Sequence, residues 1–161
     1  MLDRAIYSVI EGCRSCGGEG LVDVLDLGVT PLADRLLTAE TIDKAEPTCP
    51  LTLTFCPDCS LVQIRETVDP EVLFCNDYPY YSSVSPALLA HFRASAEEIM
   101  ERRQLGEDSL VLELASNDGY QLRNYHARGI PVLGIDPAEG PARRAIDQGI
   151  DTRIDFFTED L

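Results

Sequence analysis

Basic residues are scarce in this sequence, which has 13 Lys and Arg against 28 Asp and Glu and a net charge of −15. Proteins that bind DNA or RNA need clustered Lys and Arg to replace counterions along the phosphate backbone. Long apolar runs are also missing, because no stretch approaches the roughly 20 apolar residues of a membrane-spanning helix. We therefore expect no nucleic-acid partner and no membrane association, and the composition says nothing about protein partners.

A signal peptide is not evident either. The first residues, Met1 to Ala5, are not a basic segment followed by a long apolar one. This favours a cytoplasmic protein, and disulfide bonds are rare in that compartment. The six cysteines are therefore more typical of a metal site than of a disulfide framework.

Four of the cysteines form two Cys-x2-Cys pairs, namely Cys13, Cys16, Cys56 and Cys59. Four thiolates around Zn²⁺ make a closed tetrahedral site with no position for water or substrate, so the spacing predicts one structural zinc ion. Residues 17–55 separate the pairs, a longer gap than the about 15–20 residues of ordinary zinc ribbons. The alternatives are that the two pairs occur by chance or that they form a redox dithiol. Cys49 and Cys75 lie outside the pattern and are interpreted as ordinary partly buried thiols.

Short β-type runs surround these cysteines and predict a small β-rich zinc-binding domain over residues 1–80. Residues 21–27 alternate apolar and polar side chains, which indicates a half-buried strand, and residues 28–31 would end it as a turn. Two further strands are expected at 50–55, leading into Cys56, and at 61–64, following Cys59.

A connecting helix is expected within residues 81–106. Ser85 is a suitable N-cap, Pro86 suits the first helical position and Gly106 is the expected stop. The apolar residues of this segment recur at helical spacing and form one stripe, comprising Leu88, Leu89, Phe92, Ala96, Ile99 and Met100.

Residues 107–161 change character, because strands and helices alternate with short links. Buried strands are expected at 109–114, 132–136 and 150–154, and the intervening helices are expected at 120–128 and 142–148. This alternation is typical of a doubly wound α/β domain, and three strands are about half of such a sheet. The fold class is therefore α/β, with a zinc-binding domain followed by an incomplete Rossmann-like domain.

Candidate ligand-binding residues lie at the carboxyl ends of the first two of these strands, where α/β sheets bind ligands. They are Glu113, Ser116, Asn117, Asp118, Gly119 and Asp136. An acid at the end of the second strand typically binds the ribose hydroxyls of an adenosine-containing cofactor. The G-x-G-x-x-G turn that binds a pyrophosphate is absent, which argues against a nicotinamide cofactor.

Acidic side chains at this turn would repel phosphates but suit a cationic ligand. S-adenosylmethionine (SAM) has a sulfonium and an ammonium group, and Glu113 and Asp118 could match those charges. The pattern therefore favours SAM. The alternative is that Glu113 and Asp136 merely end their strands.

Taken together, the motifs resemble those of one family, the SAM-dependent sugar C-methyltransferases that act on nucleotide-linked deoxysugars. The matching stretches are residues 13–17, 25–28, 31–33, 56–63, 80–85, 116–120 and 129–138. The resemblance implies a zinc-binding domain, a Rossmann-like SAM-binding domain and a further α/β domain. It also implies methyl transfer from SAM to a ring carbon next to a 4-keto group of the nucleotide-linked sugar.

The resemblance further implies which residues face the sugar. Tyrosines just after the zinc-binding domain contact the sugar in the family, which makes Tyr78, Tyr80 and Tyr81 the candidates on the substrate side. Packing at the domain junction is their alternative role. The resemblance also implies a general base that is a histidine far downstream, beyond Leu161. His91 and His126 do not match that position and are interpreted as surface or packing residues.

The chain alone is thus expected to lack activity, as the N-terminal portion of such an enzyme. A non-catalytic zinc-binding module that interacts with proteins, or a truncated gene product, is the alternative. Saturable SAM binding would distinguish the enzyme from the binding module.

Overall fold

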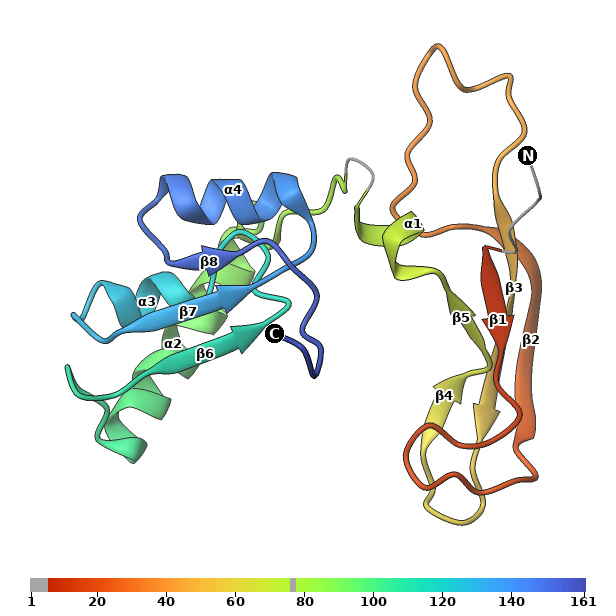
Figure 1. Ribbon diagram of the computed structural model, residues 1–161, viewed down its shortest axis with the longest axis horizontal. Coiled ribbons are helices and arrows are strands. Elements are labelled where there is room, and N and C mark those ends of the chain that lie inside the picture. The colour runs from red at the N-terminus through yellow and green to blue at the C-terminus, as the bar shows by residue number, and fades with distance from the viewer. Residues whose placement is uncertain (1–5, 76–77) are drawn as a thin grey trace. The chain divides into compact units, whose positions relative to one another are not determined.

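The computed structural model describes residues 6–75 and 78–161 and divides the chain into two compact units (Figure 1). The N-terminal unit comprises residues 1–73 and the C-terminal unit comprises residues 74–161. The division falls shortly before residue 80, the end of the zinc-binding domain in the sequence analysis. No helix in the described part of the chain is long and apolar enough to cross a membrane.

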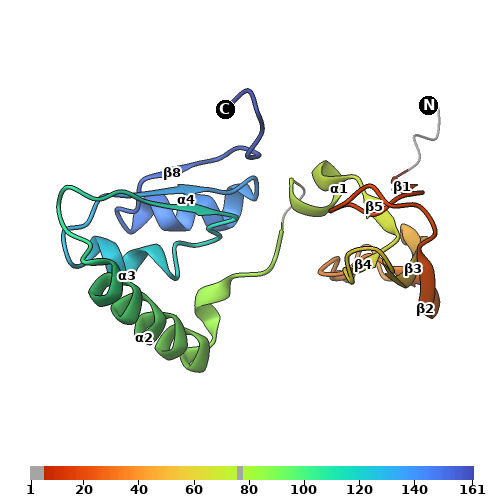
Figure 2. The same ribbon diagram turned by 90° about the horizontal axis from the view of Figure 1, so that it is seen from below.

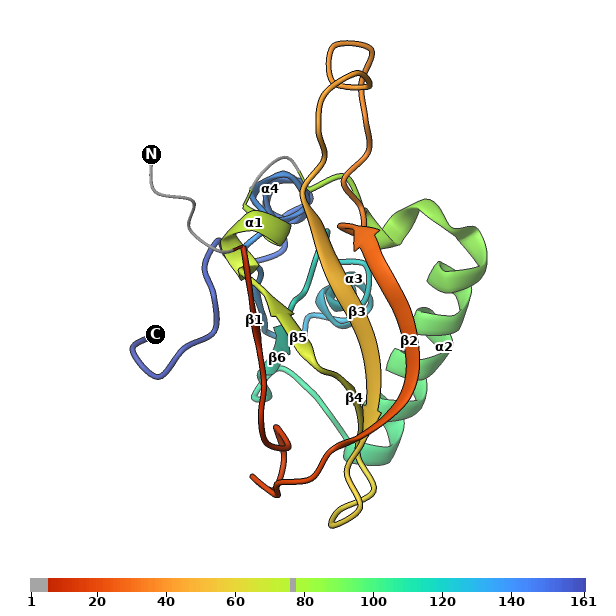
Figure 3. The same cartoon turned by 90° about the vertical axis from the view of Figure 1, so that its right-hand side faces the viewer.

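Antiparallel strands make up most of the N-terminal unit (Figure 3). Strands β2 (Val22–Pro31), β3 (Thr48–Phe55) and β4 (Val62–Ile64) form one sheet in that order, and β1 (Tyr7–Val9) pairs with β5 (Glu66–Val68). The short helix α1 (Pro70–Phe74) follows β5. The strands expected at 50–55 and 61–64 are therefore confirmed, with boundaries shifted by one or two residues.

Strand β2 differs from the expectation in two respects. It continues through Gly28 to Pro31 instead of ending in a turn, because Gly28 adopts a positive φ of 73° within an irregularity of the β2–β3 pairing. It is also not half-buried, since Leu25 is 49% and Leu27 is 54% exposed. A shift of register after Asp23 moves the following side chains to the other face, so the sequence alternation no longer corresponds to one buried side.

The C-terminal unit begins with the short 3₁₀ helix η1 (Ser82–Val84) and helix α2 (Pro86–Arg103). The expected N-terminus of α2 is confirmed, because the Ser85 hydroxyl accepts a hydrogen bond from the Leu88 N–H at 3.3 Å. The expected stop at Gly106 is wrong. Gln104 ends the helix in the left-handed conformation, with φ of 54°, and its N–H bonds back to the carbonyl of Glu101.

A parallel three-stranded sheet follows, in the order β6 (Val111–Leu114), β7 (Val132–Ile135) and β8 (Thr152–Arg153). Helix α3 (Leu122–His126) connects the first two strands, and α4 (Glu139–Asp147) connects the last two. The expected alternation of strands and helices is therefore confirmed, and the protein has a mixed α/β fold.

The core of the C-terminal unit lies between this sheet and the helices α2 and α3, which pack on the same side of it (Figure 2). The buried cluster contains Ala96, Leu122, Tyr125, Ile130, Val132, Ala145 and Ile150. Strand β6 is not buried as expected, because Leu112 and Leu114 are 48% and 47% exposed. Side chains alternate across a strand, so Val111 faces the core while these two leucines occupy the opposite face.

Candidate functional site

The four predicted cysteine ligands converge in the N-terminal unit. The Sγ atoms of Cys13, Cys16, Cys56 and Cys59 all lie within 4.8 Å of one another. Cys13 and Cys59 are separated by 3.6 Å between sulfurs, and Cys16 and Cys56 by 3.7 Å. Sulfurs at the corners of a regular tetrahedron around Zn²⁺ would be about 3.8 Å apart, given a Zn–S distance of about 2.3 Å. The geometry therefore fits one tetrahedral metal ion.

Both cysteine pairs lie in turns of the same form. The Gly17 N–H donates to the Cys13 carbonyl at 2.9 Å, and the Ser60 N–H donates to the Cys56 carbonyl at the same distance. Each turn ends in a residue with positive φ, at 73° for Gly17 and 64° for Ser60. This matching backbone directs the two sulfurs of each pair to one point.

Hydrogen bonds around the cluster connect the first cysteine turn to β4. Gln63, on β4, donates from Nε2 to the Cys13 sulfur at 3.3 Å and accepts from the Arg14 N–H at 3.1 Å. The Arg14 guanidinium donates in turn to the carbonyls of Ile64 and Glu66, both at 3.0 Å. Hydrogen bonds from residues next to the ligands orient metal ligands. Gln63 and Arg14 therefore help to hold Cys13 in position for metal binding.

The electrostatics of the cluster favour a bound cation. Hydrogen bonds from the backbone of Cys16 and Ser15 lower the pKa of Cys13 to about 6. A hydrogen bond from the Leu61 backbone lowers the pKa of Cys59, but partial desolvation of its sulfur and the three neighbouring sulfurs together raise it to about 12. Four clustered thiols cannot all ionise unless a positive charge lies between them. With four protein ligands the site has no open position, so it suits a structural role.

The two remaining cysteines lie outside this cluster. Cys49 on β3 is buried, and its pKa is raised by burial and by the charge of Glu66. Cys75 is exposed, and its Sγ lies 4.0 Å from the Pro137 carbonyl.

The second group of predicted residues meets at the carboxyl ends of β6 and β7. Asp136 follows β7, and its two carboxylate oxygens accept the N–H groups of Asn117 at 2.7 Å and Ala138 at 2.8 Å. Asn117 belongs to the turn after β6 and has a positive φ of 49°. The turn and the strand end are thereby fixed to each other, at the place where parallel sheets bind ligands.

Burial controls the charge of the carboxyl groups in this site. Burial and, to a smaller extent, the charge of Asp136 raise the pKa of Glu113 to about 7, although a hydrogen bond from Tyr120 partly offsets the shift. The pKa of Asp136 is also raised by burial, although the N–H groups of Ala138 and Asn117 counteract the shift. The pKa of Tyr120 rises to about 12 because of burial and the charge of Glu113.

Unsatisfied acceptors concentrate at this site. Among the described residues, five buried side-chain atoms have no hydrogen-bond partner, and three of them are Glu113 Oε2, Ser116 Oγ and Asp118 Oδ1. Buried polar groups normally find partners, so unsatisfied oxygens at a strand end suit a ligand that donates hydrogen bonds or carries positive charge. SAM fits this donor set through its ammonium and sulfonium groups and its ribose hydroxyls.

The candidate tyrosines differ in their surroundings. Tyr81 lies against the start of α4, with the Arg144 guanidinium 5.3 Å from its ring centre, and a Cβ on Gly140 would come within 2.8 Å of its hydroxyl. Tyr80 is 43% exposed. The ring of Tyr78 makes an edge contact with Phe74, at 5.5 Å between ring centres. Tyr80 is thus the most accessible of the three to a ligand.

Three residues that the sequence analysis did not single out belong to this site, namely Ser83, Tyr120 and Arg144. The Ser83 hydroxyl donates to Asp118 Oδ2, and Arg144 Nε lies 3.9 Å from the same oxygen. Ser83 and Tyr120 fall within the stretches 80–85 and 116–120 that match the family's motifs, and this was the available signal. The helical position of Arg144 gave no sign that it would lie beside Asp118.

Two other features lie apart from these sites. His91 and His126 are both exposed, and His91 makes an edge contact with Phe92 at 5.3 Å between ring centres.

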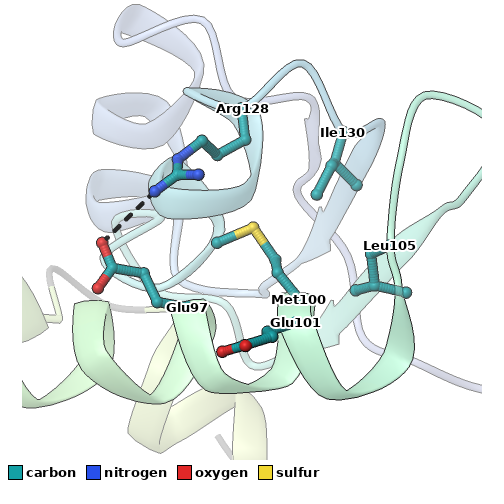
Figure 4. Close-up of a pocket in the computed structure, with 6 residues that line it drawn as sticks. All are labelled: Glu97, Met100, Glu101, Leu105, Arg128 and Ile130. Carbon is teal, nitrogen blue, oxygen red and sulfur yellow. Dashed lines mark ion pairs between the residues drawn. The ribbon is translucent and has the colours of Figure 1, made fainter.

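An open surface hollow of about 600 Å³ is lined by Glu97, Met100, Glu101, Leu105, Arg128 and Ile130. Figure 4 shows its Arg128–Glu97 ion pair, with 3.8 Å between the charged atoms. None of the predicted site residues lines this hollow.

Comparisons with known proteins relate this sequence to C-methyltransferases. Residues 13–74 match the family Methyltransf_13, described as "Putative zinc binding domain". The chain is also 36% identical over 156 residues to "C-methyltransferase NovU" from Streptomyces niveus. This alignment covers 97% of the chain but 37% of the relative's length. The resemblance to the N-terminal region of a C-methyltransferase, which the motifs indicated, is confirmed.

Proposed function

We propose that this chain, whose sequence resembles the N-terminal region of a C-methyltransferase, is the SAM-binding and zinc-binding portion of a SAM-dependent enzyme that methylates a ring carbon of a nucleotide-linked keto-deoxysugar. The observation that carries the proposal is the group of unsatisfied buried oxygens on Glu113, Ser116 and Asp118, at the carboxyl ends of parallel strands. The relative's activity as a C-methyltransferase supports the same conclusion.

In this proposal the cofactor lies along the ends of β6 and β7, which would form part of a Rossmann-like domain. Asp136 would accept the two ribose hydroxyls, because each carboxylate oxygen has a second lone pair besides the one that takes a backbone N–H. Glu113 would pair with a positive group of the cofactor. A side chain at Gly119 would be crowded, since a Cβ would lie 3.2 Å from Ala145 Cβ and from Ile150 Cγ1, and the φ of 71° favours glycine.

The metal centre contributes stability to this arrangement. Zn²⁺ bound by Cys13, Cys16, Cys56 and Cys59 would hold the N-terminal unit together and take no part in the reaction. The closed set of four sulfurs supports this role, because an ion with four protein ligands cannot also activate water or polarise a substrate.

Bound SAM supplies an electrophilic methyl group to a carbanion next to the sugar's keto group. Formation of that carbanion requires a base and groups that stabilise the enolate oxygen. Tyr80 and Tyr81 are proposed to bind and orient the sugar nucleotide beside the cofactor. Neither histidine of this chain lies among the proposed site residues, so we do not assign the base within it.

The chain spans about 37% of the length of the curated relative that it matches. The activity of a whole enzyme is therefore tested with the complete gene product that contains this chain. A protein that interacts with partners through its zinc-binding domain, without catalysis, is the competing account. Exposed apolar side chains on β2, including Val24 and Val29, are the observation that favours it.

Methyl transfer tests the proposal directly. Incubation of the gene product with methyl-labelled SAM and a nucleotide-linked 4-keto-deoxysugar is expected to place the label on carbon, which mass spectrometry of the sugar detects. Tyr80→Phe and Tyr81→Phe are each expected to raise the KM for the sugar about tenfold, because each removes a hydroxyl that can hydrogen-bond the substrate. Tyr7→Phe, in β1 of the other unit, is the matched control and should leave KM unchanged.

If the protein binds SAM saturably but no label reaches the sugar, the proposed methyl acceptor is wrong and the enzyme methylates another compound. Absence of both transfer and SAM binding would leave the zinc-binding interaction module as the better account.

A further inference from the structure

The side chain of Asn117 attaches the segment that carries the two proposed sugar-binding tyrosines to the proposed cofactor turn. The Asn117 side-chain oxygen accepts the Ser82 N–H at 2.9 Å, and its amide nitrogen donates to the Tyr80 carbonyl at 3.1 Å. Asn117 thus uses both ends of its amide on the backbone that flanks Tyr81. It is 7% exposed, so this amide is largely withdrawn from solvent.

The next residue in the turn makes a second attachment to the same segment. Asp118 is fully buried, and its Oδ2 accepts the Ser83 hydroxyl proton. Arg144 reaches the same oxygen at 3.9 Å while its guanidinium lies over the Tyr81 ring. Two consecutive residues of the turn therefore fix the positions of consecutive residues in the tyrosine segment.

The backbone of Asn117 points the other way, since its N–H donates to Asp136 at 2.7 Å. A positive φ of 49° allows this division between backbone and side chain. Asparagine adopts that conformation more readily than most residues. One residue thereby contacts both the acid proposed to bind the cofactor's ribose and the segment proposed to bind the sugar.

We infer that Asn117 is a positioning residue that couples the cofactor site to the sugar site, and that it holds the Tyr80–Tyr81 segment in place instead of binding the cofactor with its side chain. The inference rests on the proposed function. When Asp136 is engaged by a bound ligand, the turn at Asn117 is held more firmly, and the tyrosine segment becomes ordered with it. Cofactor binding would then prepare the sugar site.

Asn117→Gly is the variant that isolates this role. Glycine accepts the positive φ without strain and keeps the N–H that bonds to Asp136, so only the side-chain contacts with the tyrosine segment are lost. Asn124→Ala is the matched control, because it removes another asparagine side chain of the same unit, whose amide bonds to the backbone carbonyls of Gln121 and Tyr120 and not to the tyrosine segment.

Three measurements on the complete gene product test the coupling, namely amide hydrogen exchange at Ser82, the dissociation constant for SAM and the KM for the sugar nucleotide. In Asn117→Gly we expect exchange at Ser82 to accelerate at least about tenfold, and SAM to lose its ability to slow it. The SAM dissociation constant should change less than about threefold, and the sugar KM should rise about tenfold. Asn124→Ala should change none of these.

Two outcomes overturn the inference while leaving the proposed function intact. One is unchanged exchange at Ser82 in Asn117→Gly, and the other is SAM binding weakened tenfold or more with an unchanged sugar KM. The latter would make Asn117 a direct cofactor ligand. Failure of the wild-type protein to bind SAM would overturn the proposed function, and the coupling with it, even if Ser82 exchange without ligand still responded to the substitution.

Discussion

Replacing Cys56 with serine is expected to abolish metal binding and to unfold the N-terminal unit. Cys56 is fully buried, and its sulfur lies 3.7 Å from that of Cys16 at the centre of the cluster. In small zinc-binding domains the metal supplies an apparent binding energy of about 10–16 kcal/mol to folding. The free energy of unfolding of a folded domain is only about 5–15 kcal/mol. If removal of one ligand abolishes metal binding, the binding energy lost is as large as the stability of the whole unit.

The measurement combines metal analysis of the purified protein with circular dichroism. The native protein is expected to contain one zinc ion per chain and to lose β structure when a strong chelator removes it. Cys75→Ser is the matched control, because Cys75 is exposed and lies outside the cluster. A Cys56→Ser variant that retained stoichiometric zinc and a native melting curve would show that the cluster is not the metal site.

SAM binding is expected to strengthen about tenfold between pH 6 and pH 8 through ionisation of Glu113. Burial raises the pKa of this carboxyl group to about 7, so about one-tenth of it is ionised at pH 6 and about nine-tenths at pH 8. Only the carboxylate attracts a cationic ligand. The dissociation constant should therefore fall as pH rises through 7 and level off above that range.

Calorimetric titration with SAM at a series of pH values measures this dependence. Glu113→Gln keeps the shape of the side chain and removes the titrating group, so its dissociation constant should vary little over the same range. Any titration of the ligand itself appears in the variant as well and is subtracted. If the wild-type profile matches that of Glu113→Gln, the carboxylate of Glu113 does not bind the cationic group of SAM.

Local patterns in the sequence predicted those elements that neighbouring residues determine. The repeated Cys-x2-Cys turns placed four ligands at one point, and Ser85 with Pro86 identified the start of α2. Both signals depend on backbone hydrogen bonds within a few residues of each other, such as that from Gly17 to Cys13. Such contacts need no knowledge of the rest of the fold.

Features that depend on distant residues were not predicted. Strands β1 and β5 have three residues each, and they exist because Tyr7 to Val9 pair with residues 66–68 far along the chain. Three residues are too few to show the alternation of apolar and polar side chains that identifies a strand. The exposure of β2 was not predicted either. Its pairing with β3 is irregular after Asp23, so the alternation in the sequence does not mark one buried face.

The proposed ligand site was predicted only in part for the same reason. Glu113, Asn117 and Asp136 could be identified because strand ends in a parallel sheet share one edge. The contacts of Asp118 with Ser83 and Arg144 join three separate elements, the 3₁₀ helix η1, the turn after β6 and helix α4. No spacing in the sequence could indicate that these residues would meet.

Titration of the complete gene product with SAM by isothermal calorimetry tests the central claim most directly. The account predicts saturable binding of one SAM per chain, weakened at least about tenfold by Asp136→Ala, because the buried acid would lose its hydrogen bonds to the ribose. Glu98→Gln, on the exposed face of α2, should bind like the wild type. Absence of saturable binding, or an Asp136→Ala variant with wild-type affinity, would contradict the assignment of a SAM site to this chain.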